Sequence, residues 1–151
     1  MRKPTILFLC SGNSCRSQMA EAFAKKYGRG EFDVHSAGLR PTEIHPLTKQ
    51  VLEEAGLDIS DQYAKGVDHY LGKLMVNYLF IVCDKAAGSC PTVWPGANRM
   101  ERIVHAFEDP AAVAGTDEEK LAAFRRVRDE IGQAVKQWID SHRAASEKDE
   151  G

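Results

Sequence analysis

The sequence lacks several features that would place it in specialised classes of protein. It has no apolar run long enough to cross a membrane, no internal repeat and no Pro-, Gly- or Ser-rich linker. A formal net charge of −2 argues against a strongly basic nucleic-acid binder and is not acidic enough for a disordered chain. The opening run MRKPTILFLCSGNSC turns polar too early for a signal peptide. We therefore expect a cytoplasmic monomer with no nucleic-acid or membrane partner.

What the sequence contains is typical of one globular domain. Its 151 residues are 43% hydrophobic and 28% charged, which is ordinary for a soluble protein. We place this domain at residues 1–142, followed by a polar C-terminal tail at 143–151.

Apolar runs and helical patterns alternate along the chain. Short buried strands are expected at 5–10, 32–38, 78–83 and 102–107, and helices are expected at 17–28, 45–56 and 116–142. This order predicts a single-domain α/β fold with a four-stranded, mostly parallel sheet flanked by helices on both faces. The functional crevice of such a sheet lies beyond the carboxyl ends of its strands.

The chain has four cysteines, at positions Cys10, Cys15, Cys83 and Cys90. In a reducing cytoplasm they are more typical of catalysis or metal binding than of permanent disulfides. Cys10 ends the first expected strand and Cys83 ends the third, so both should emerge at the same edge of the sheet.

The segment CSGNSCRS has the pattern C-x5-R-S between a strand and a helix. Successive backbone N–H groups and the helix N-terminus attract an oxyanion there, and Arg16 adds a bidentate donor. The same positive field favours the thiolate form of Cys10, to which Ser17 could donate a hydrogen bond. The residues expected to bind the anion are Ser11, Gly12, Asn13, Ser14, Cys15, Arg16 and Ser17.

Two other interpretations of this loop stay open from the residues alone. It could bind an anion passively, although no Gly-Lys-Ser/Thr of a Walker-type loop follows. The four cysteines could also bind zinc, but their C-x4-C and C-x6-C spacings differ from the usual C-x2-C, and Arg16 would face the metal.

The segment CSGNSCRSQMAEAF resembles the phosphate-binding loop of the low-molecular-weight protein tyrosine phosphatases, and more closely that of the thioredoxin-coupled arsenate reductases built on the same fold. The resemblance runs from about Thr5 to about Trp138. It includes HSAG at 35–38, IVCDKAAGSCP at 81–91, EDP at 108–110 and FRRVRDEI at 124–131.

The resemblance implies reduction of arsenate to arsenite, an arsenic detoxification that needs no cofactor. The Cys10 thiolate would attack arsenic while Asp109 acts as general acid. Cys83 would then attack Cys10, Cys90 would attack Cys83, and thioredoxin would reduce the Cys83–Cys90 disulfide. Phosphate and sulfate would compete as oxyanions. Cys15 would be dispensable for this relay and could pair with Cys10 under oxidation.

Some members of that family hold a potassium ion with residues that match Asn13, Glu21 and Ser36. The acidic fourth position falls at Lys65, and a lysine there would repel a cation. We therefore expect no bound metal and predict that the Lys65 ammonium replaces the ion and pairs with Glu21. The alternative is an exposed lysine that points to solvent.

Two competing functions remain. A low-molecular-weight protein tyrosine phosphatase would need neither Cys83 nor Cys90; its C-x5-R-S-P motif has proline where this chain has Gln18, and the tyrosines it carries near the Asp-Pro loop are missing here. Weak phosphatase activity could nevertheless persist. A thiol-rich arsenite binder would not need Arg16. Glu108 competes with Asp109 for the role of acid.

Overall fold

The computed structural model describes residues 3–10, 13–38, 40–70, 75–82 and 101–150, with side chains as far as His142. Strands and helices alternate within these ranges, as the sequence predicts. The strands are β1 (Thr5–Cys10), β2 (Asp33–Gly38), β3 (Tyr78–Ile81) and β4 (Glu101–Val104). The helices are α1 (Arg16–Gly28), α2 (Pro46–Glu54) and α3 (Asp117–Glu150), with short 3₁₀ turns η1 (Val67–His69) and η3 (Pro110–Ala112).

The four strands form one sheet in the order β2-β1-β3-β4, and every neighbouring pair is parallel. At the carboxyl end of the sheet, Cys10 is opposite Gly38, and Leu9 is opposite Ile81. The predicted four-stranded α/β fold is therefore confirmed. The chain leaves all four strands toward the same edge, which is where a parallel sheet gathers its functional loops.

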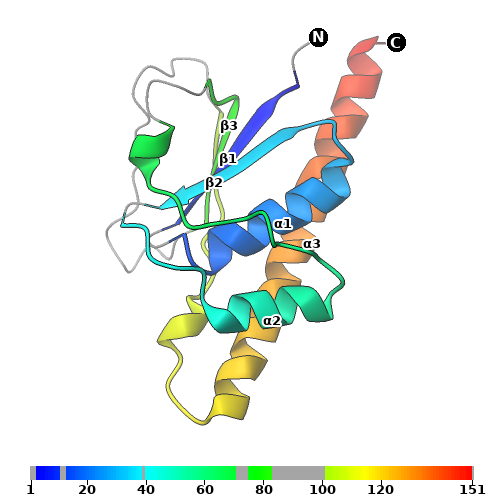
Figure 1. Ribbon diagram of the computed structural model, residues 1–151. Coiled ribbons are helices and arrows are strands. Elements are labelled where there is room, and N and C mark those ends of the chain that lie inside the picture. Colours follow the sequence, from blue (N-terminus) through cyan, green and yellow to red (C-terminus); the bar gives the residue numbers. More distant parts are fainter. Residues whose placement is uncertain (1–2, 11–12, 39, 71–74, 83–100, 151) are drawn as a thin grey trace.

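β1 lies in the middle of the sheet and is buried along its whole length. Ile6, Leu7 and Leu9 are all 0% exposed, because a central parallel strand is covered on both faces. In Figure 1, α1 and α3 lie side by side on one side of the sheet, and η1 lies on the other. The apolar run that precedes Cys10 thus places this cysteine in the interior, at the carboxyl edge of the sheet.

α3 covers the sheet with one continuous apolar stripe. Its innermost side chains are at most 1% exposed, and these are Phe124, Val127, Ile131, Val135 and Ile139. The helix runs on past residue 142, where the sequence predicts that the domain ends and the polar tail begins, because Ala, Glu and Lys in this tail favour helix without needing a core contact. Across the ranges described, no helix is both long and apolar enough to span a membrane.

α2 packs against α1 and α3, and an exposed ion cluster joins it to α3. Arg125 donates two hydrogen bonds to the carboxylate of Glu54, at 2.9 and 2.7 Å. Arg128 donates to the same carboxylate at 3.2 Å and to the carbonyl of Val51 at 2.9 Å. These contacts hold the C-terminal part of α2 against α3. The first residues of α2 lie next to the loop that follows β1.

Candidate active site

The candidate site begins where β1 ends and α1 starts. Cys10 is the last residue of β1 and is 3% exposed, and Cys15 is the residue that caps the start of α1. The loop between them therefore faces the positive end of the α1 dipole. Ser11 and Gly12 lie outside the described residues, as do Cys83 and Cys90.

Asn13 makes the turn of this loop. Its φ of 52° lies in the left-handed region, which asparagine tolerates better than most non-glycine residues and glycine tolerates best. The side chain is fully buried, and its amide donates to Ser17 Oγ at 2.8 Å and to Ser36 Oγ at 2.9 Å. Its Oδ1 accepts from the backbone N–H of Lys65 at 2.7 Å. Both ends of the Asn13 amide are thus used to hold the turn.

Arg16 opens α1 and is 4% exposed. Its Nη1 donates to the carbonyl of Phe107 at 2.9 Å, and its Nη2 lies 3.9 Å from Asp109 Oδ2. Its Nε is buried and has no hydrogen-bond partner within the part of the chain that the structure describes. A buried guanidinium donor left over in this way is suited to a bound oxyanion, which would accept its hydrogen bond.

Asp109 enters the site from the loop after β4. Its Oδ1 accepts from the backbone N–H of Ala111 at 3.0 Å and starts the η3 turn, while Oδ2 is directed at Arg16. The side chain is 41% exposed and can exchange protons with water. Glu108, the competing acid, instead pairs with Arg126 on α3. The geometry therefore favours Asp109 over Glu108 as the acid that faces Arg16.

Cys15 is a second buried thiol in the loop. Burial raises its pKa, an effect that hydrogen bonds from Ser14 and Thr48 only partly oppose. The carbonyl of Ser14 is itself held by the backbone N–H of His45 at 3.1 Å and by Thr48 Oγ1 at 3.0 Å. A thiol with a raised pKa stays protonated at neutral pH, so Cys15 is a poor nucleophile.

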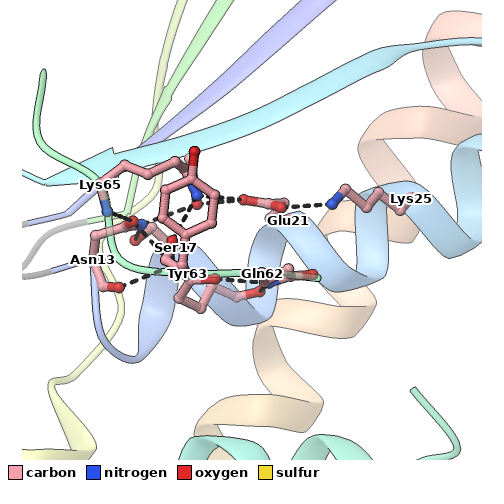
Figure 2. A network of polar contacts seen from close by, with 9 residues as sticks. Asn13, Ser17, Glu21, Lys25, Gln62, Tyr63 and Lys65 are labelled. Carbon is pink, nitrogen blue, oxygen red and sulfur yellow. Dashed lines mark hydrogen bonds and ion pairs between the residues drawn. The ribbon is translucent and has the colours of Figure 1, made fainter. Parts of the chain in front are cut away.

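A buried ion pair lies behind the loop. Lys65 Nζ lies 3.6 Å from Glu21 Oε1 and donates to the carbonyl of Tyr63 at 2.7 Å, with the Tyr63 ring 4.6 Å away. Figure 2 shows Glu21 between Lys65 and Lys25, and Lys25 Nζ lies 2.7 Å from the second carboxylate oxygen. Lys65 is 6% exposed, so the alternative of a lysine that points to solvent is wrong, and the predicted pairing with Glu21 is present.

Ser36 joins this pair to the Asn13 turn. Its hydroxyl donates to Glu21 Oε1 and accepts from the amide of Asn13. Burial lowers the pKa of Lys65, while the charge of Glu21 acts in the opposite direction. The oxyanion loop is therefore supported from behind by a network that contains one carboxylate and two lysines.

No group of three or more His, Cys, Asp or Glu residues is placed to hold a metal ion among residues 3–10, 13–38, 40–70, 75–82 and 101–150. The zinc interpretation of the four cysteines needs Cys83 and Cys90, which lie beyond these ranges.

Sequence reasoning did not identify two glutamines of the site. Gln18 is fully buried and hydrogen-bonds to Asn13, and Gln62 is 8% exposed and hydrogen-bonds to Gln18. They are 44 positions apart. Arg16, Ser17 and Gln18 are all buried polar residues in the first turn of α1, so no local signal singles out Gln18.

Comparison with known proteins agrees with this geometry. Residues 5–149 match the family model described as low molecular weight phosphotyrosine protein phosphatase. An arsenate reductase of Halalkalibacterium halodurans is 44% identical over 141 residues, which is 93% of this chain and 99% of that protein. A solved arsenate reductase in the phosphate-binding state has a TM-score of 0.69 at 30% identity, and the match covers 91% of this chain and 98% of that one.

A thioredoxin-dependent arsenate reductase of Corynebacterium glutamicum has a TM-score of 0.71 at 26% identity, over 95% of this chain and 63% of that chain. The phosphatase-type loop, the Arg16–Asp109 pair and these similarities lead to the same assignment. The chain belongs to the low molecular weight phosphotyrosine protein phosphatase family, in its arsenate reductase branch.

Proposed function

We propose that this protein reduces arsenate to arsenite at Cys10, with Arg16 and Asp109 as its partners and thioredoxin as the source of electrons. The observation that carries the proposal is the buried Arg16, whose unused Nε lies beside the loop that starts at Cys10. Arsenate is a tetrahedral oxyanion, and a guanidinium together with a helix N-terminus binds such anions.

In the first step, the Cys10 thiolate forms a bond to arsenic and one oxygen leaves. Asp109 supplies a proton to the departing hydroxide, so the oxygen leaves as water. Asp109 suits this role because one of its oxygens is fixed by Ala111 while the other faces Arg16, 3.9 Å away. Arg16 holds the negative charge that remains on the other arsenate oxygens.

In the second step, the Cys83 thiolate attacks the sulfur of Cys10. The sulfur–arsenic bond breaks, and its electron pair stays on arsenic, which becomes arsenite. Cys90 then attacks Cys83 and releases the Cys10 thiolate. Thioredoxin's dithiol reduces the resulting Cys83–Cys90 disulfide. Support for these two thiols comes from the sequence and its resemblance.

Phosphate and sulfate would compete for the same cradle, since they share the tetrahedral shape and charge of arsenate. The solved relative in a phosphate-binding state is in line with such competition. The relay also needs free thiols and reduced thioredoxin, and we therefore infer the reducing cytoplasm as its compartment.

We also propose that the Lys65 ammonium takes the place that a potassium ion occupies in some relatives. Its buried position next to Glu21, and the link through Ser36 to Asn13, support this proposal. Arsenate turnover is then expected to be equal in potassium and sodium buffers of the same ionic strength. A steep rise with potassium would contradict it.

The experiment that tests the main proposal is a coupled assay of NADPH oxidation with arsenate, thioredoxin and thioredoxin reductase. We expect turnover in the wild type and none in Cys83→Ser or Cys90→Ser. Hydrolysis of an aryl phosphate serves as the folding control, because it needs only the Cys10 loop. Strong hydrolysis in all three proteins without arsenate turnover would instead identify a phosphatase of the same family.

A further inference from the structure

Gln18 makes several side-chain hydrogen bonds, although the proposed chemistry assigns it no role. It is fully buried in the first turn of α1. Its Nε2 lies 3.0 Å from the carbonyl of Asn13, 2.9 Å from Asn13 Oδ1 and 2.9 Å from the carbonyl of Tyr63. Its Oε1 accepts from Gln62 Nε2 at 2.7 Å. One carboxamide thus joins the loop turn to the segment that contains Gln62, Tyr63 and Lys65.

The first consequence concerns the direction of the Asn13 amide. Asn13 Oδ1 accepts from Gln18 Nε2 and from the backbone N–H of Lys65, so both of its contacts are donors. An amide turned the other way would place its NH₂ group against these donors. Its Nδ2 must therefore face Ser17 and Ser36, as it does at 2.8 and 2.9 Å.

The second consequence concerns the hydroxyl of Ser17. Because Ser17 Oγ accepts from Asn13, its hydrogen is left for a different acceptor. Ser36 Oγ also accepts from the Asn13 amide, and the Ser36 hydroxyl donates to Glu21. For Ser17, in the first turn of α1, no hydrogen bond to Cys10 is formed among the residues that the structure describes, and donation to the Cys10 thiolate stays a prediction from the sequence.

We propose that Gln18 is a positioning residue for the oxyanion loop. It holds Asn13 in its left-handed turn and fixes the Asn13 amide, which in turn directs Ser17. We expect the backbone N–H groups that follow this turn to face a bound anion only when the turn is formed. This inference rests on the proposed function insofar as the loop's ligand is a tetrahedral oxyanion.

The test compares Gln18→Met with Gln62→Met. Both replace a glutamine by an apolar side chain of similar length, but only the first removes the contacts to Asn13. Inorganic phosphate is the probe, titrated by calorimetry, and thermal unfolding is recorded for each protein. We expect phosphate to bind about tenfold more weakly to Gln18→Met, as loss of one buried hydrogen-bonded contact implies, and within about threefold of wild type to Gln62→Met.

A merely structural role would lower the unfolding temperature of both variants without separating their phosphate affinities. Equal phosphate affinity in Gln18→Met and wild type overturns the proposal. If Gln18→Met does not fold, Gln18→Asn takes its place, since it keeps a carboxamide that is too short to reach Asn13 and Tyr63 together. We expect weakened phosphate binding there also, and unchanged binding would again overturn the proposal.

A double-mutant cycle shows whether Gln18 acts through Asn13. Glycine adopts positive φ without help, so Asn13→Gly removes the need to hold the turn. If Gln18 acts through Asn13, Gln18→Met should weaken phosphate binding much less in the Asn13→Gly protein than in the wild type. Additive effects would show that Gln18 acts elsewhere. A wild type that binds phosphate but does not reduce arsenate would refute the proposed function and leave this test intact.

Discussion

Among the described residues, two charge clusters are each centred on one carboxylate with two cations, and they differ in their access to water; in the second, Arg128 also pairs with Asp129. Glu21 lies with Lys25 and Lys65 behind the oxyanion loop; the side chains of Glu21 and Lys65 are each 5% exposed, and Lys25 is 41% exposed. Glu54 lies with Arg125 and Arg128 between α2 and α3; the side chain of Glu54 is 32% exposed, Arg125 is 48% exposed and Arg128 is 15% exposed. The two clusters therefore differ in what they contribute to the fold.

The exposed cluster is an ordinary surface feature whose charges remain partly hydrated. Such pairs contribute little to folding, and salt weakens them. The buried cluster loses hydration, which lowers the pKa of Lys65, and depends on its internal partners. Through Ser36, this buried cluster is hydrogen-bonded to the Asn13 turn. Four predictions test this contrast, beginning with the change that should destabilise the fold most.

Lys65→Met should have the largest effect on folding. It leaves the carboxylate of Glu21 buried with only the half-exposed Lys25 as a charged partner. Removing one member of a buried pair costs about 3 kcal/mol in the free energy of unfolding. Urea denaturation measures this loss, with Lys25→Met as the matched control, for which we expect a clearly smaller loss. A loss for Lys65→Met no greater than that of the control would show that the pair is not effectively buried.

Adding Glu21→Gln to Lys65→Met should restore at least half of the lost stability. The glutamine carbonyl can still accept from the hydroxyl of Ser36, and no unpaired charge then remains in the interior. Urea denaturation of the single and double variants gives the coupling energy, about 1 to 3 kcal/mol for residues in contact. A double variant less stable than Lys65→Met alone would contradict the picture of an uncompensated charge.

The stability gap between wild type and Lys65→Met should widen in mildly alkaline solution. The pKa of Lys65 in the folded protein is below the ordinary value of 10.5, so between these two values the unfolded chain holds more protons at this site. Folding of the wild type is then favoured as pH rises through this window, whereas the variant has no such titration. Denaturation curves at several pH values up to 10.5 measure the gap. A stability gap that narrows as the pH rises would contradict a lowered pKa of Lys65 in the folded protein.

Glu54→Gln should have the smallest effect, and acid should remove it. Hydrogen bonds from Arg125 hold the pKa of Glu54 below its ordinary value of 4.5. The contribution of this carboxylate is thus complete above pH 4.5 and is lost as pH falls through the lowered pKa. Melting temperatures of the variant and the wild type should differ slightly at neutral pH, converge in acid and converge also in high salt. A difference that persists under both conditions would contradict an exposed, screened cluster.

Most of the fold could be predicted because its signals are local. The uninterrupted apolar run before Cys10 is what a central parallel strand requires, and the stripe of α3 has the helical period. The end of α3 could not be predicted in the same way. Its last residues lack an apolar stripe, and their helix propensity alone carries the helix on to Glu150.

The same distinction between local and tertiary signals applies to the candidate site. The places of Cys10, Arg16 and Asp109 in the fold could be predicted because a short motif and the carboxyl ends of strands locate them, while their catalytic roles remain predictions. The link from Gln62 through Gln18 to Asn13 could not, because it depends on side chains that only tertiary folding brings together. The contact of Arg16 with the carbonyl of Phe107 was equally hidden, since a backbone acceptor leaves no mark on the identity of its residue. Cys83 and Cys90 remain predictions.

That contact also has a consequence for how the protein is made. Arg16 and the carbonyl of Phe107 are 91 positions apart, so a growing chain releases the cysteine loop long before the residue that anchors it. β3 pairs with β1 through the distant partners Ile6 and Tyr78, and such non-local pairing is slow. During synthesis, Arg16 therefore lacks this backbone acceptor until β4 and the segment after it have been made. The contact that anchors Arg16 can form only after more than two thirds of the chain has been synthesised.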